Sequence, residues 1–396
     1  MTEWIECTLD KLGEIVGGAT PSTKCEDYYG GSIPWITPKD LSSFKGRYIT
    51  SGERNITEKG LASCSAQMMP KDAVLFTSRA PIGYVAIASQ SVCTNQGFKS
   101  IVVNEKADPL FVYYLLKYNK DAIEAMGSGT TFKEVSGKTM RAVKVRIPLD
   151  VSYQKRIAAV LDSLDTKIEN NERINDNLEQ QAQAIYHERF ETVSPNDLPS
   201  EWRIVTLGEV ATISNKSFNP LKEPEILLEH YSIPAFDEAR FPVFELSTSI
   251  KSNKFIIDTS CFMISKLNPT TKRVWKPYCL TGNAVCSTEF IVYKAKDKTI
   301  IDFLYSVIDS NSFSDFMCSH VTGSTGSRQR TTPSDTLSYE LILPSEDELT
   351  EFQSLVSPMY AQIRINAIEN DRLKRLRDSL LPKLMSGEID VSTIQL

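Results

Sequence analysis

The feature that most constrains the fold of this chain is a long segment, residues 152–191, whose apolar side chains recur at steps of three and four residues. Such a period predicts an amphipathic helix that packs on a second helix along a coiled-coil seam. The a and d positions of the heptad are Ile157, Leu161, Leu164, Ile168, Asn171, Asn175, Leu178, Ala182 and Ile185. Two consecutive seam positions are asparagines, which cost stability in a dry seam but fix its register and partner.

The same pattern returns near the C-terminus, and both asparagines recur there at a constant offset of 195 residues. We therefore predict that the two long helices pack on each other as a rigid rod. Ser345 with Glu348 predicts the start of the second helix, Pro358 a kink or late start, and Pro382 with Gly387 its end. Its seam residues are Phe352, Val356, Met359, Ile363, Asn366, Asn370, Leu373, Arg377 and Leu380.

The remainder of the chain also contains an internal sequence repeat. The residues around Trp4, Thr8-Leu9 and Gly13-Glu14 reappear around Trp202, Thr206-Leu207 and Gly208-Glu209, and a strand-like run ending in proline closes each copy at residues 143–148 and 339–344. Short β-branched runs between glycine and proline turns indicate a mixed sheet in each copy. Single helices are expected at about residues 110–126 and 301–317.

The predicted fold class is α+β, with two mixed α/β globular domains joined by two long antiparallel helices that form a coiled coil, and with a pseudo-two-fold internal repeat. The predicted division is a globular domain at 1–150, a long helix and linker at 151–199, a second globular domain at 200–344, and a second long helix with a C-terminal tail at 345–396.

Charge is distributed unevenly along the chain, whose net charge is −6. Residues 151–199 carry −4 and residues 346–396 carry −3, whereas residues 1–150 carry +2 and residues 200–345 carry −1. The acidity therefore belongs to the helices, and each globular domain can present a basic face to nucleic acid. No apolar run is long enough for a membrane span and the N-terminus has no secretory pattern, so we expect a cytoplasmic protein.

Motifs for catalysis or metal binding are not found in the sequence. The eight cysteines and three histidines lack metal-ligand spacing, which predicts reduced thiols and no metal. Ser136-Gly137-Lys138-Thr139 resembles the end of a phosphate-binding loop, but Phe132 replaces the first glycine. Asn219-Pro220-Leu221 and Asn268-Pro269-Thr270 both lack the Asn-Pro-Pro-aromatic motif of a DNA methyltransferase. We therefore expect a chain without catalytic residues.

The predicted rod has the dimensions of a spacer on DNA. The 29 residues from Ile157 to Ile185 would span roughly 44 Å as a helix, more than one turn of B-DNA at about 34–36 Å. Two unlike domains at that separation would contact two short DNA segments and skip the bases between them, which suits a split, asymmetric target. The alternative is a two-domain protein whose helices merely pack on their own domains.

With these residues in view, the chain resembles the specificity subunits of type I restriction-modification systems. The resemblance rests on five segments: 33–41 (IPWITPKDL), 77–83 (TSRAPIG), 94–99 (TNQGFK), 231–237 (YSIPAFD) and 381–389 (LPKLMSGEI). It implies a non-catalytic subunit that binds double-stranded DNA, serves two modification (methyltransferase) subunits and restriction/translocase subunits, and uses its helices as spacer and docking surface. S-adenosylmethionine, ATP and magnesium would bind those partners, with no cofactor in this chain.

The candidate DNA-binding residues are Arg, Lys, Asn, Gln, Thr, Ser and aromatic side chains expected on loops. In the first domain they are Lys39, Arg79, Tyr84, Asn95, Gln96, Thr130, Thr131 and Lys133. In the second they are Lys266, Asn268, Lys272, Arg273, Trp275, Ser327, Arg328, Gln329 and Arg330.

Roles and alternatives differ among these residues. Arg79 and Gln96 suit bidentate base contacts, although Arg79 could instead be a buried structural arginine. Lys39 and Lys133 suit phosphates. The sharpest prediction is Arg328-Gln329-Arg330, whose alternative is a solvated charged turn. The competing functions are a scaffold without a DNA role and a methyltransferase with its own recognition domain.

Overall fold

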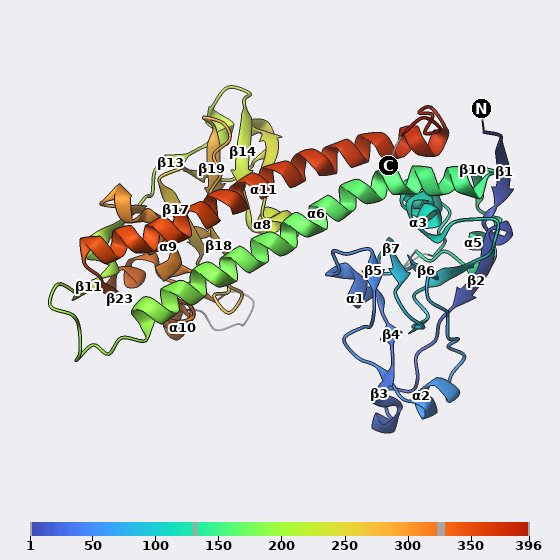
Figure 1. The fold of residues 1–396 in the computed structure, drawn as a ribbon, viewed down its shortest axis with the longest axis horizontal. Coiled ribbons are helices and arrows are strands. Elements are labelled where there is room, and N and C mark those ends of the chain that lie inside the picture. Colours follow the sequence, from blue (N-terminus) through green and yellow to red (C-terminus); the bar gives the residue numbers. More distant parts are fainter. Residues whose placement is uncertain (1, 130–132, 323–328, 395–396) are drawn as a thin grey trace. The chain divides into compact units, whose positions relative to one another are not determined.

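The computed structural model describes residues 2–129, 133–322 and 329–394 and divides the chain into two compact units (Figure 1). Unit 1 comprises residues 1–169 and 372–396, and unit 2 comprises residues 170–371. Each unit contains part of both long helices, α6 (Val151–Tyr186) and α11 (Glu346–Ser386). Each compact unit therefore consists of one globular domain and parts of both long helices. The predicted division differs, because it assigned each long helix to a segment of its own, in sequence order.

The globular domain of unit 1, called the first domain, is built on a five-stranded mixed sheet. The strand order is β2-β9-β6-β7-β5, and only the β5–β7 pair is parallel. The bounds are β2 Gly13–Gly17, β9 Lys99–Val103, β6 Val74–Ser78, β7 Ile82–Ala88 and β5 Tyr48–Ile49. The remaining strands are β1 Trp4–Thr8 paired with β10 Lys144–Pro148, β4 Trp35–Ile36 paired with β8 Cys93–Thr94, and β3 Tyr29–Ile33.

Within the described residues of the first domain there are five α-helices. They are α1 Pro38–Ser42, α2 Glu58–Ala62, α3 Pro109–Tyr118, α4 Lys120–Ala125 and α5 Gly137–Ala142. Asp108 caps α3 by accepting a hydrogen bond from the amide of Phe111, and Pro109 fits the first turn because it has no N–H to leave unpaired. The single helix predicted over 110–126 is two helices, because Asn119 ends α3 and precedes α4.

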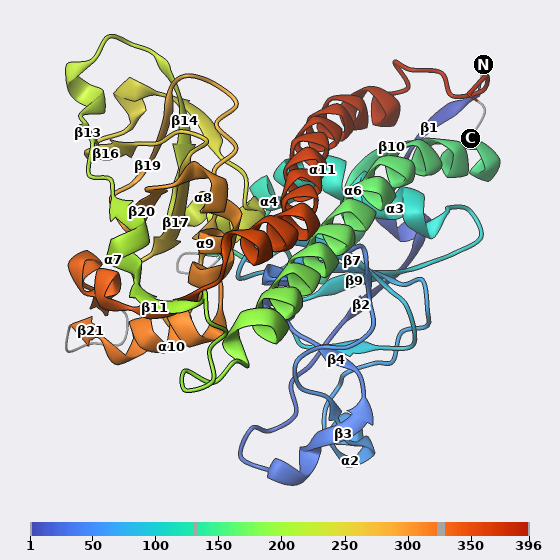
Figure 2. The ribbon, with the colours of Figure 1, turned by 60° about the vertical axis from the view of Figure 1, so that its left-hand side comes forward.

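The globular domain of unit 2, called the second domain, contains two larger sheets (Figure 2). One has the order β12-β20-β17-β18, with β12 Ala211–Ile213, β20 Phe290–Ala295, β17 Cys261–Ser265 and β18 Val274–Trp275. The other has the order β13-β16-β19-β14-β15, with β13 Ser217–Phe218, β16 Lys254–Ile256, β19 Ala284–Ser287, β14 Leu227–Tyr231 and β15 Val243–Leu246.

The part of the second domain that the structure describes also has two antiparallel strand pairs and four α-helices. The pairs are β11 Arg203–Thr206 with β23 Glu340–Leu343, and β21 Val321–Thr322 with β22 Arg330–Thr331. The helices are α7 Leu207–Val210, α8 Ile233–Ala239, α9 Ile301–Ile308 and α10 Asn311–Ser319, so the helix predicted over 301–317 is also divided. The antiparallel pairing of β11 with β23 matches that of β1 with β10, as expected for a duplicated unit.

Each unit has a large core that joins its domain to both long helices. In unit 1, Ile157 and Leu161 of α6 and Leu384 of α11 belong to the same apolar cluster as α3 and the sheet. In unit 2, Tyr186 of α6 and Phe352 of α11 lie in one cluster with Phe303. The helices therefore pack on the domains as well as on each other, which combines the two arrangements that the sequence left open.

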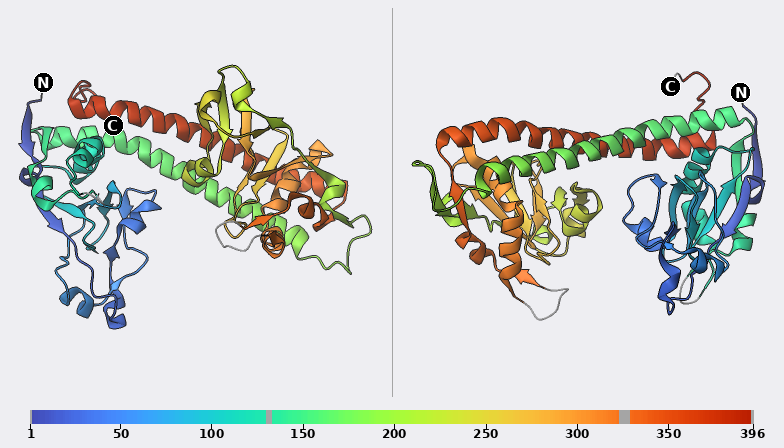
Figure 3. Two further views of the ribbon diagram at one scale, coloured as in Figure 1. Left: turned by 180° about the vertical axis from the view of Figure 1, so that it is seen from behind. Right: turned by 60° about the horizontal axis from the view of Figure 1, so that its bottom comes forward.

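Within each unit, α6 and α11 run side by side in opposite directions (Figure 3). In unit 2, Asn171 Nδ2 donates to Asn370 Oδ1 at 2.9 Å, and Asn366 Nδ2 donates to Asn175 Oδ1 at 2.8 Å, so rising numbers on α6 meet falling numbers on α11. In unit 1, the Asp165 carboxylate pairs with Arg377 at 2.7 Å.

The predicted seam residues have the following burial. Leu161, Ile168, Asn171, Asn366 and Asn370 are buried, whereas Leu164, Asn175, Leu178, Met359, Ile363 and Leu373 are partly buried. The four asparagines form side-chain hydrogen bonds between the helices, which satisfies their polar groups inside the interface. A coiled coil along the whole length of both helices stays a prediction.

The start of α11 agrees with its sequence signal, but its interior does not. Ser345 accepts a hydrogen bond from the amide of Glu348 at 3.4 Å, and the helix begins at Glu346. The helix continues through Pro358 and Pro382 and ends at Ser386, before Gly387 with φ of 79°. The helix does not start late at Pro358, so of the two alternatives there only the kink stays a prediction, and Pro382 does not end the helix.

Candidate nucleic-acid interface

Four segments of the first domain that are distant in sequence meet at one end of its sheet. The Ser78 amide donates to the Gly97 carbonyl at 2.7 Å, and the Val135 amide donates to the Ser78 carbonyl at 3.0 Å. The Asn95 amide donates to the Ile36 carbonyl at 3.0 Å, which brings the start of α1 alongside. The turn between β6 and β7, the segment 95–98, the segment 133–135 and α1 thus form one surface. We call it the first loop cluster.

Basic and amide side chains of the prediction lie on this cluster. Arg79 is 35% exposed, and its guanidinium lies 3.6 Å from the carboxylate of Glu134, which is also 3.4 Å from Lys99. Lys39, at the other side of the cluster, pairs with Glu53 at 2.7 Å, and Lys133 is exposed. Such part-exposed ion pairs are weak, so these cations can exchange a carboxylate for a DNA phosphate or base.

The other predicted residues of the first domain differ in exposure and in the hydrogen bonds that they already make within the domain. Gln96 is exposed, and its Oε1 accepts a hydrogen bond from the Thr20 hydroxyl. Asn95 Oδ1 accepts from the Gly97 amide at 2.8 Å, so Asn95 shapes its own turn. Tyr84 is partly buried against the core formed by Phe98 and its neighbours. Thr130 and Thr131 lie outside the described residues.

The second domain builds the same arrangement from different side chains. The Lys266 amide donates to the Glu289 carbonyl at 2.9 Å, and the Thr331 amide donates to the Lys266 carbonyl at 3.1 Å. By these bonds, Lys266, Glu289 and Thr331 take the places of Ser78, Gly97 and Val135. We call this surface the second loop cluster.

A backbone feature supports the equivalence of the two clusters. Ala80 and Asn268 both have left-handed φ values, 52° and 49°, and each precedes a proline. Left-handed backbone is uncommon outside glycine, so its recurrence at the same turn marks a conserved geometry of the two copies. The Asn268 amide also donates to the Gln329 carbonyl at 2.9 Å, which places both residues in the second loop cluster.

Arg330 is held by a carboxylate in this cluster. Its Nε and Nη2 donate to the two oxygens of Glu289, both at 3.0 Å, and the hydrogen bond and charge of Glu289 raise the pKa of Arg330. The residue lies in strand β22 and carries this ion pair, whereas the alternative to a DNA contact was a solvated charged turn. To contact a base, Arg330 would therefore have to replace its two hydrogen bonds to Glu289 with hydrogen bonds to the base. Ser327 and Arg328 lie outside the described residues.

Three residues of the second domain that were predicted to contact DNA instead contact other residues of the same domain. Arg273, with a side chain only 13% exposed, donates to both oxygens of Asp237 at 2.6 and 2.8 Å. Lys272 donates to the Asp309 carbonyl at 2.7 Å and lies 3.0 Å from its carboxylate. Trp275 is 2% exposed and packs against Tyr231. Trp275 is therefore a core residue, the opposite of the exposed aromatic side chain that the prediction required.

The acidic members of both clusters were not among the predicted residues. Glu134 and Glu289 lie among the basic side chains, where they hold Arg79 and Arg330. Carboxylates can accept a hydrogen bond from the cytosine amino group, and arginine can donate two to guanine, so each cluster carries both kinds of base-reading group. Only the position of Glu134 beside Lys133 was a signal in the sequence.

Among the residues that the structure describes, no group of three or more His, Cys, Asp or Glu side chains is placed to hold a metal ion. Within the same residues, no helix has the length and apolar character needed to cross a membrane.

This chain is similar to known proteins in both sequence and fold. A family model described as the type I restriction modification DNA specificity domain matches residues 1–180. The type I restriction enzyme MjaIX specificity subunit of Methanocaldococcus jannaschii is 32% identical, over 99% of this chain and 95% of that protein. The EcoR124I/EcoR124II specificity subunit of Escherichia coli is 29% identical over 40% of each chain.

A solved structure has a similar fold. The type I restriction-modification S subunit from M. genitalium matches with a TM-score of 0.60, covering 97% of this chain and 96% of that chain at 16% identity. At this identity the similarity concerns the fold alone.

Proposed function

Because the chain belongs to the specificity subunits of type I restriction-modification systems, and is thus a non-catalytic DNA-recognition subunit, we propose that it reads a bipartite, asymmetric target in double-stranded DNA. The first loop cluster would contact one half of the target and the second loop cluster the other. The observation that carries this proposal is the duplication of one backbone arrangement with different side chains.

Different side chains at equivalent places would give different base preferences. The first cluster has Ser78 and Gly97 where the second has Lys266 and Glu289. Since direct readout depends on the donors and acceptors that reach the base edges, two such surfaces would prefer two different short sequences. A target read by one chain in this way is asymmetric.

The long helices would serve as the spacer that sets the unread gap. The 36 residues of α6 correspond to about 54 Å of helix, which exceeds one turn of B-DNA at about 34–36 Å. Hydrogen bonds between Asn171 and Asn370 and between Asn366 and Asn175 support a fixed register for an antiparallel coiled coil.

The helices would also be the docking surface for two modification subunits and for restriction subunits. Apolar side chains exposed on the helices in unit 2 support this role, since Ile174 is 45% exposed and Ile365 is 55% exposed. S-adenosylmethionine, ATP and magnesium would bind those partners, and the complex would act on DNA in the cytoplasm.

The test is a methylated-base map of genomic DNA from cells that express the chain with its modification subunits. We expect one bipartite methylated motif, which disappears when this chain is omitted. Methylation that does not depend on the chain would favour a scaffold without a DNA role. Methylation by the chain without its partners would favour a methyltransferase that carries its own recognition domain.

Lengthening the helices tests their role as spacer. Insertion of four residues at matched places in α6 and α11 adds about 6 Å to each helix. The unread gap should then lengthen by about two base pairs, at about 3.4 Å each. A methylated motif that keeps its original gap would contradict the spacer.

A further inference from the structure

We propose that Arg47 is a positioning residue that fixes the angle between the first domain and helix α6, and thereby limits the gap lengths that the protein accepts. This inference rests on the proposed reading of a bipartite target. It concerns unit 1 alone, where the first domain contacts the initial part of α6 at two successive stretches.

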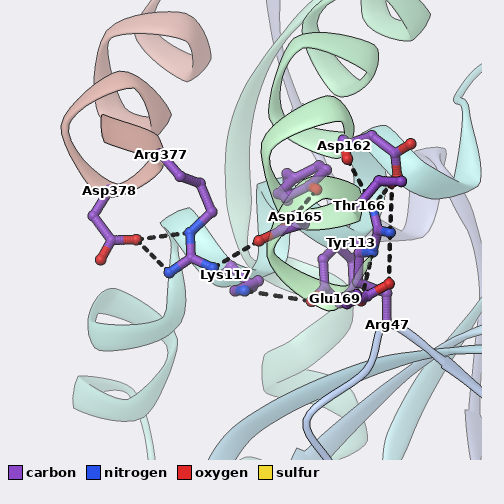
Figure 4. Close-up of polar contacts among 10 residues, drawn as sticks. Arg47, Tyr113, Lys117, Asp162, Asp165, Thr166, Glu169, Arg377 and Asp378 are labelled. Atoms are coloured by element: carbon purple, nitrogen blue, oxygen red, sulfur yellow. Dashed lines mark hydrogen bonds and ion pairs between the residues drawn. The ribbon is translucent and has the colours of Figure 1, made fainter. Parts of the chain in front are cut away.

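The guanidinium of Arg47 is fully engaged by one helix (Figure 4). Nε and Nη2 donate to the two oxygens of Glu169 at 3.1 and 2.9 Å, and Nη2 also donates to the Thr166 hydroxyl at 2.9 Å. Nη1 donates to the Asp162 carbonyl at 3.1 Å and to its carboxylate. All five N–H groups of the arginine therefore have acceptors on two turns of α6, in a fork that lysine cannot reproduce.

The backbone of Arg47 is tied to the sheet that carries the first loop cluster. Its carbonyl accepts a hydrogen bond from the Ile87 amide in β7 at 2.7 Å, and the residue directly precedes β5, the parallel partner of β7. Strand β7 begins immediately after the turn that contains Arg79. A displacement of Arg47 relative to α6 is thus transmitted through one strand to the proposed DNA surface.

A second polar contact between the first domain and α6 lies at Asp165, between Asp162 and Glu169, which bond to Arg47. Asp165 of α6 is 5% exposed and accepts a hydrogen bond from the Tyr114 hydroxyl of α3 at 2.7 Å, while its other oxygen pairs with Arg377 of α11 at 2.7 Å. Burial and the Asp165 carboxylate raise the pKa of Tyr114, so its hydroxyl remains a donor. The first domain thus contacts this stretch of α6 from both α3 and Arg47.

Two attachments along one helix define an angle, and their chemistry differs. Apolar residues of α6, including Ile157 and Leu161, join the domain through the core, whereas residues 162–169 join it through polar groups. The Asp162 and Glu169 side chains are 34% and 36% exposed, so water can solvate them when Arg47 is removed. Loss of Arg47 should therefore loosen the angle while the apolar core keeps the domain folded.

The side chain remains charged in this setting. Burial by itself lowers the pKa of Arg47, but the hydrogen bond and charge of Glu169, together with Asp162, raise it overall. Unit 2 has a smaller counterpart, because Arg240 reaches α6 through one ion pair, with Glu179 at 2.7 Å. Among the residues that the structure describes, Arg240 thus makes fewer polar contacts with α6 than Arg47 does.

The test compares the complete complex of Arg47→Met with the natural protein on a methylated-base map. Met retains an apolar stem of similar length but no donors. We expect unchanged bases in both half-sites and about tenfold more methylation at targets whose gap differs by one base pair. Arg47→Lys should fall between the two. An Arg141→Met control should keep the natural gap, because the hydrogen bond that Arg141 donates goes to the Ile15 carbonyl of β2, at 3.3 Å.

Tyr114→Phe is the second variant, since it removes one hydrogen bond to Asp165 with little change in packed volume. We expect the same broadening in weaker form. If Arg47→Met fails to fold, Arg47→Lys decides the role of Arg47, because lysine keeps the charge but cannot reproduce the guanidinium contacts. Unchanged gap selection, or an equal loss of methylation at every gap in a folded variant, would overturn the role of Arg47. Absence of any bipartite motif for the natural protein would instead contradict the proposed function.

Discussion

The first and second loop clusters share a backbone but distribute their charges differently. In the first, the cation Arg79 lies on the turn after β6 and the anion Glu134 lies just before Val135. In the second, the place before Thr331 is taken by the cation Arg330, and its anion, Glu289, occupies the place of Gly97. Backbone hydrogen bonds thus maintain the scaffold, while the charged groups that would select bases are free to change.

The largest expected effect comes from copying one side chain between clusters. A Cβ at Gly97 would lie 2.8 Å from Pro38 Cγ and 2.9 Å from Asn95 Oδ1, so Gly97→Glu should destabilise the first domain by up to about 3 kcal/mol. Urea unfolding measures this cost, with Glu289→Gly as the reciprocal variant, whose fold should persist. A Gly97→Glu protein of natural stability would show that the two scaffolds differ less than their side chains suggest.

Removal of Arg330 tests whether the second cluster contacts bases. We expect Arg330→Ala to weaken binding to the specific target by about 1–3 kcal/mol for a lost base contact while the fold survives. Fluorescence anisotropy with target and scrambled duplexes measures the difference. Arg203→Ala is the matched control, an exposed arginine on β11 of the same domain. Equal affinities for Arg330→Ala and the natural protein would remove this residue from the interface.

In unit 2 the two long helices are joined by the neutral hydrogen bond between Asn171 and Asn370, whereas in unit 1 they are joined by the Asp165–Arg377 ion pair. Replacement of both Asn171 and Asn370 by leucine should raise the free energy of unfolding by about 1 kcal/mol, because apolar side chains at these seam positions are buried without needing hydrogen-bonding partners. Register or partner choice should become less specific. Thermal unfolding and the gap of the methylated motif measure the two effects, and an unaltered motif would make the asparagines incidental to register.

The smallest expected effect concerns the acidic residue of the first cluster. Glu134→Gln removes the charge that holds Arg79 and Lys99, so affinity for non-specific DNA should rise a few-fold and its salt dependence should steepen. Titration at several salt concentrations measures both. Glu53→Gln, which releases Lys39, is the comparison variant at the other side of the cluster. A decrease in affinity for Glu134→Gln would indicate that its carboxylate itself accepts a hydrogen bond from DNA.

Several features of the fold could be predicted because they depend on local periodicity. The duplicated unit, the two long helices and the facing asparagines follow from residue spacing alone. Proline signals were less informative, since α11 continues through Pro358. Phe352 and Val356 before that proline and Tyr360 after it are buried in the unit 2 core, and their packing outweighs one missing backbone donor.

The candidate site was predictable as a set of loops but not as a set of free side chains. Arg273 and Lys272 were named as DNA contacts from residue type, yet Asp237 and Asp309 hold them. Trp275 was named for its aromatic ring, yet it lies between β17 and the core residue Tyr231. Nothing near these residues in the sequence indicates partners that are more than thirty residues away.

The sequence by itself determined that one unit occurs twice and that each copy ends in a long amphipathic helix, because a helical period is recorded in neighbouring residues. Only the tertiary structure decided which charged groups meet. Arg47 bonds to Asp162 and Glu169, over one hundred residues further along the chain, because folding brings the edge of the sheet against α6. Contacts between distant residues depend on how the elements pack, and no local pattern encodes that packing.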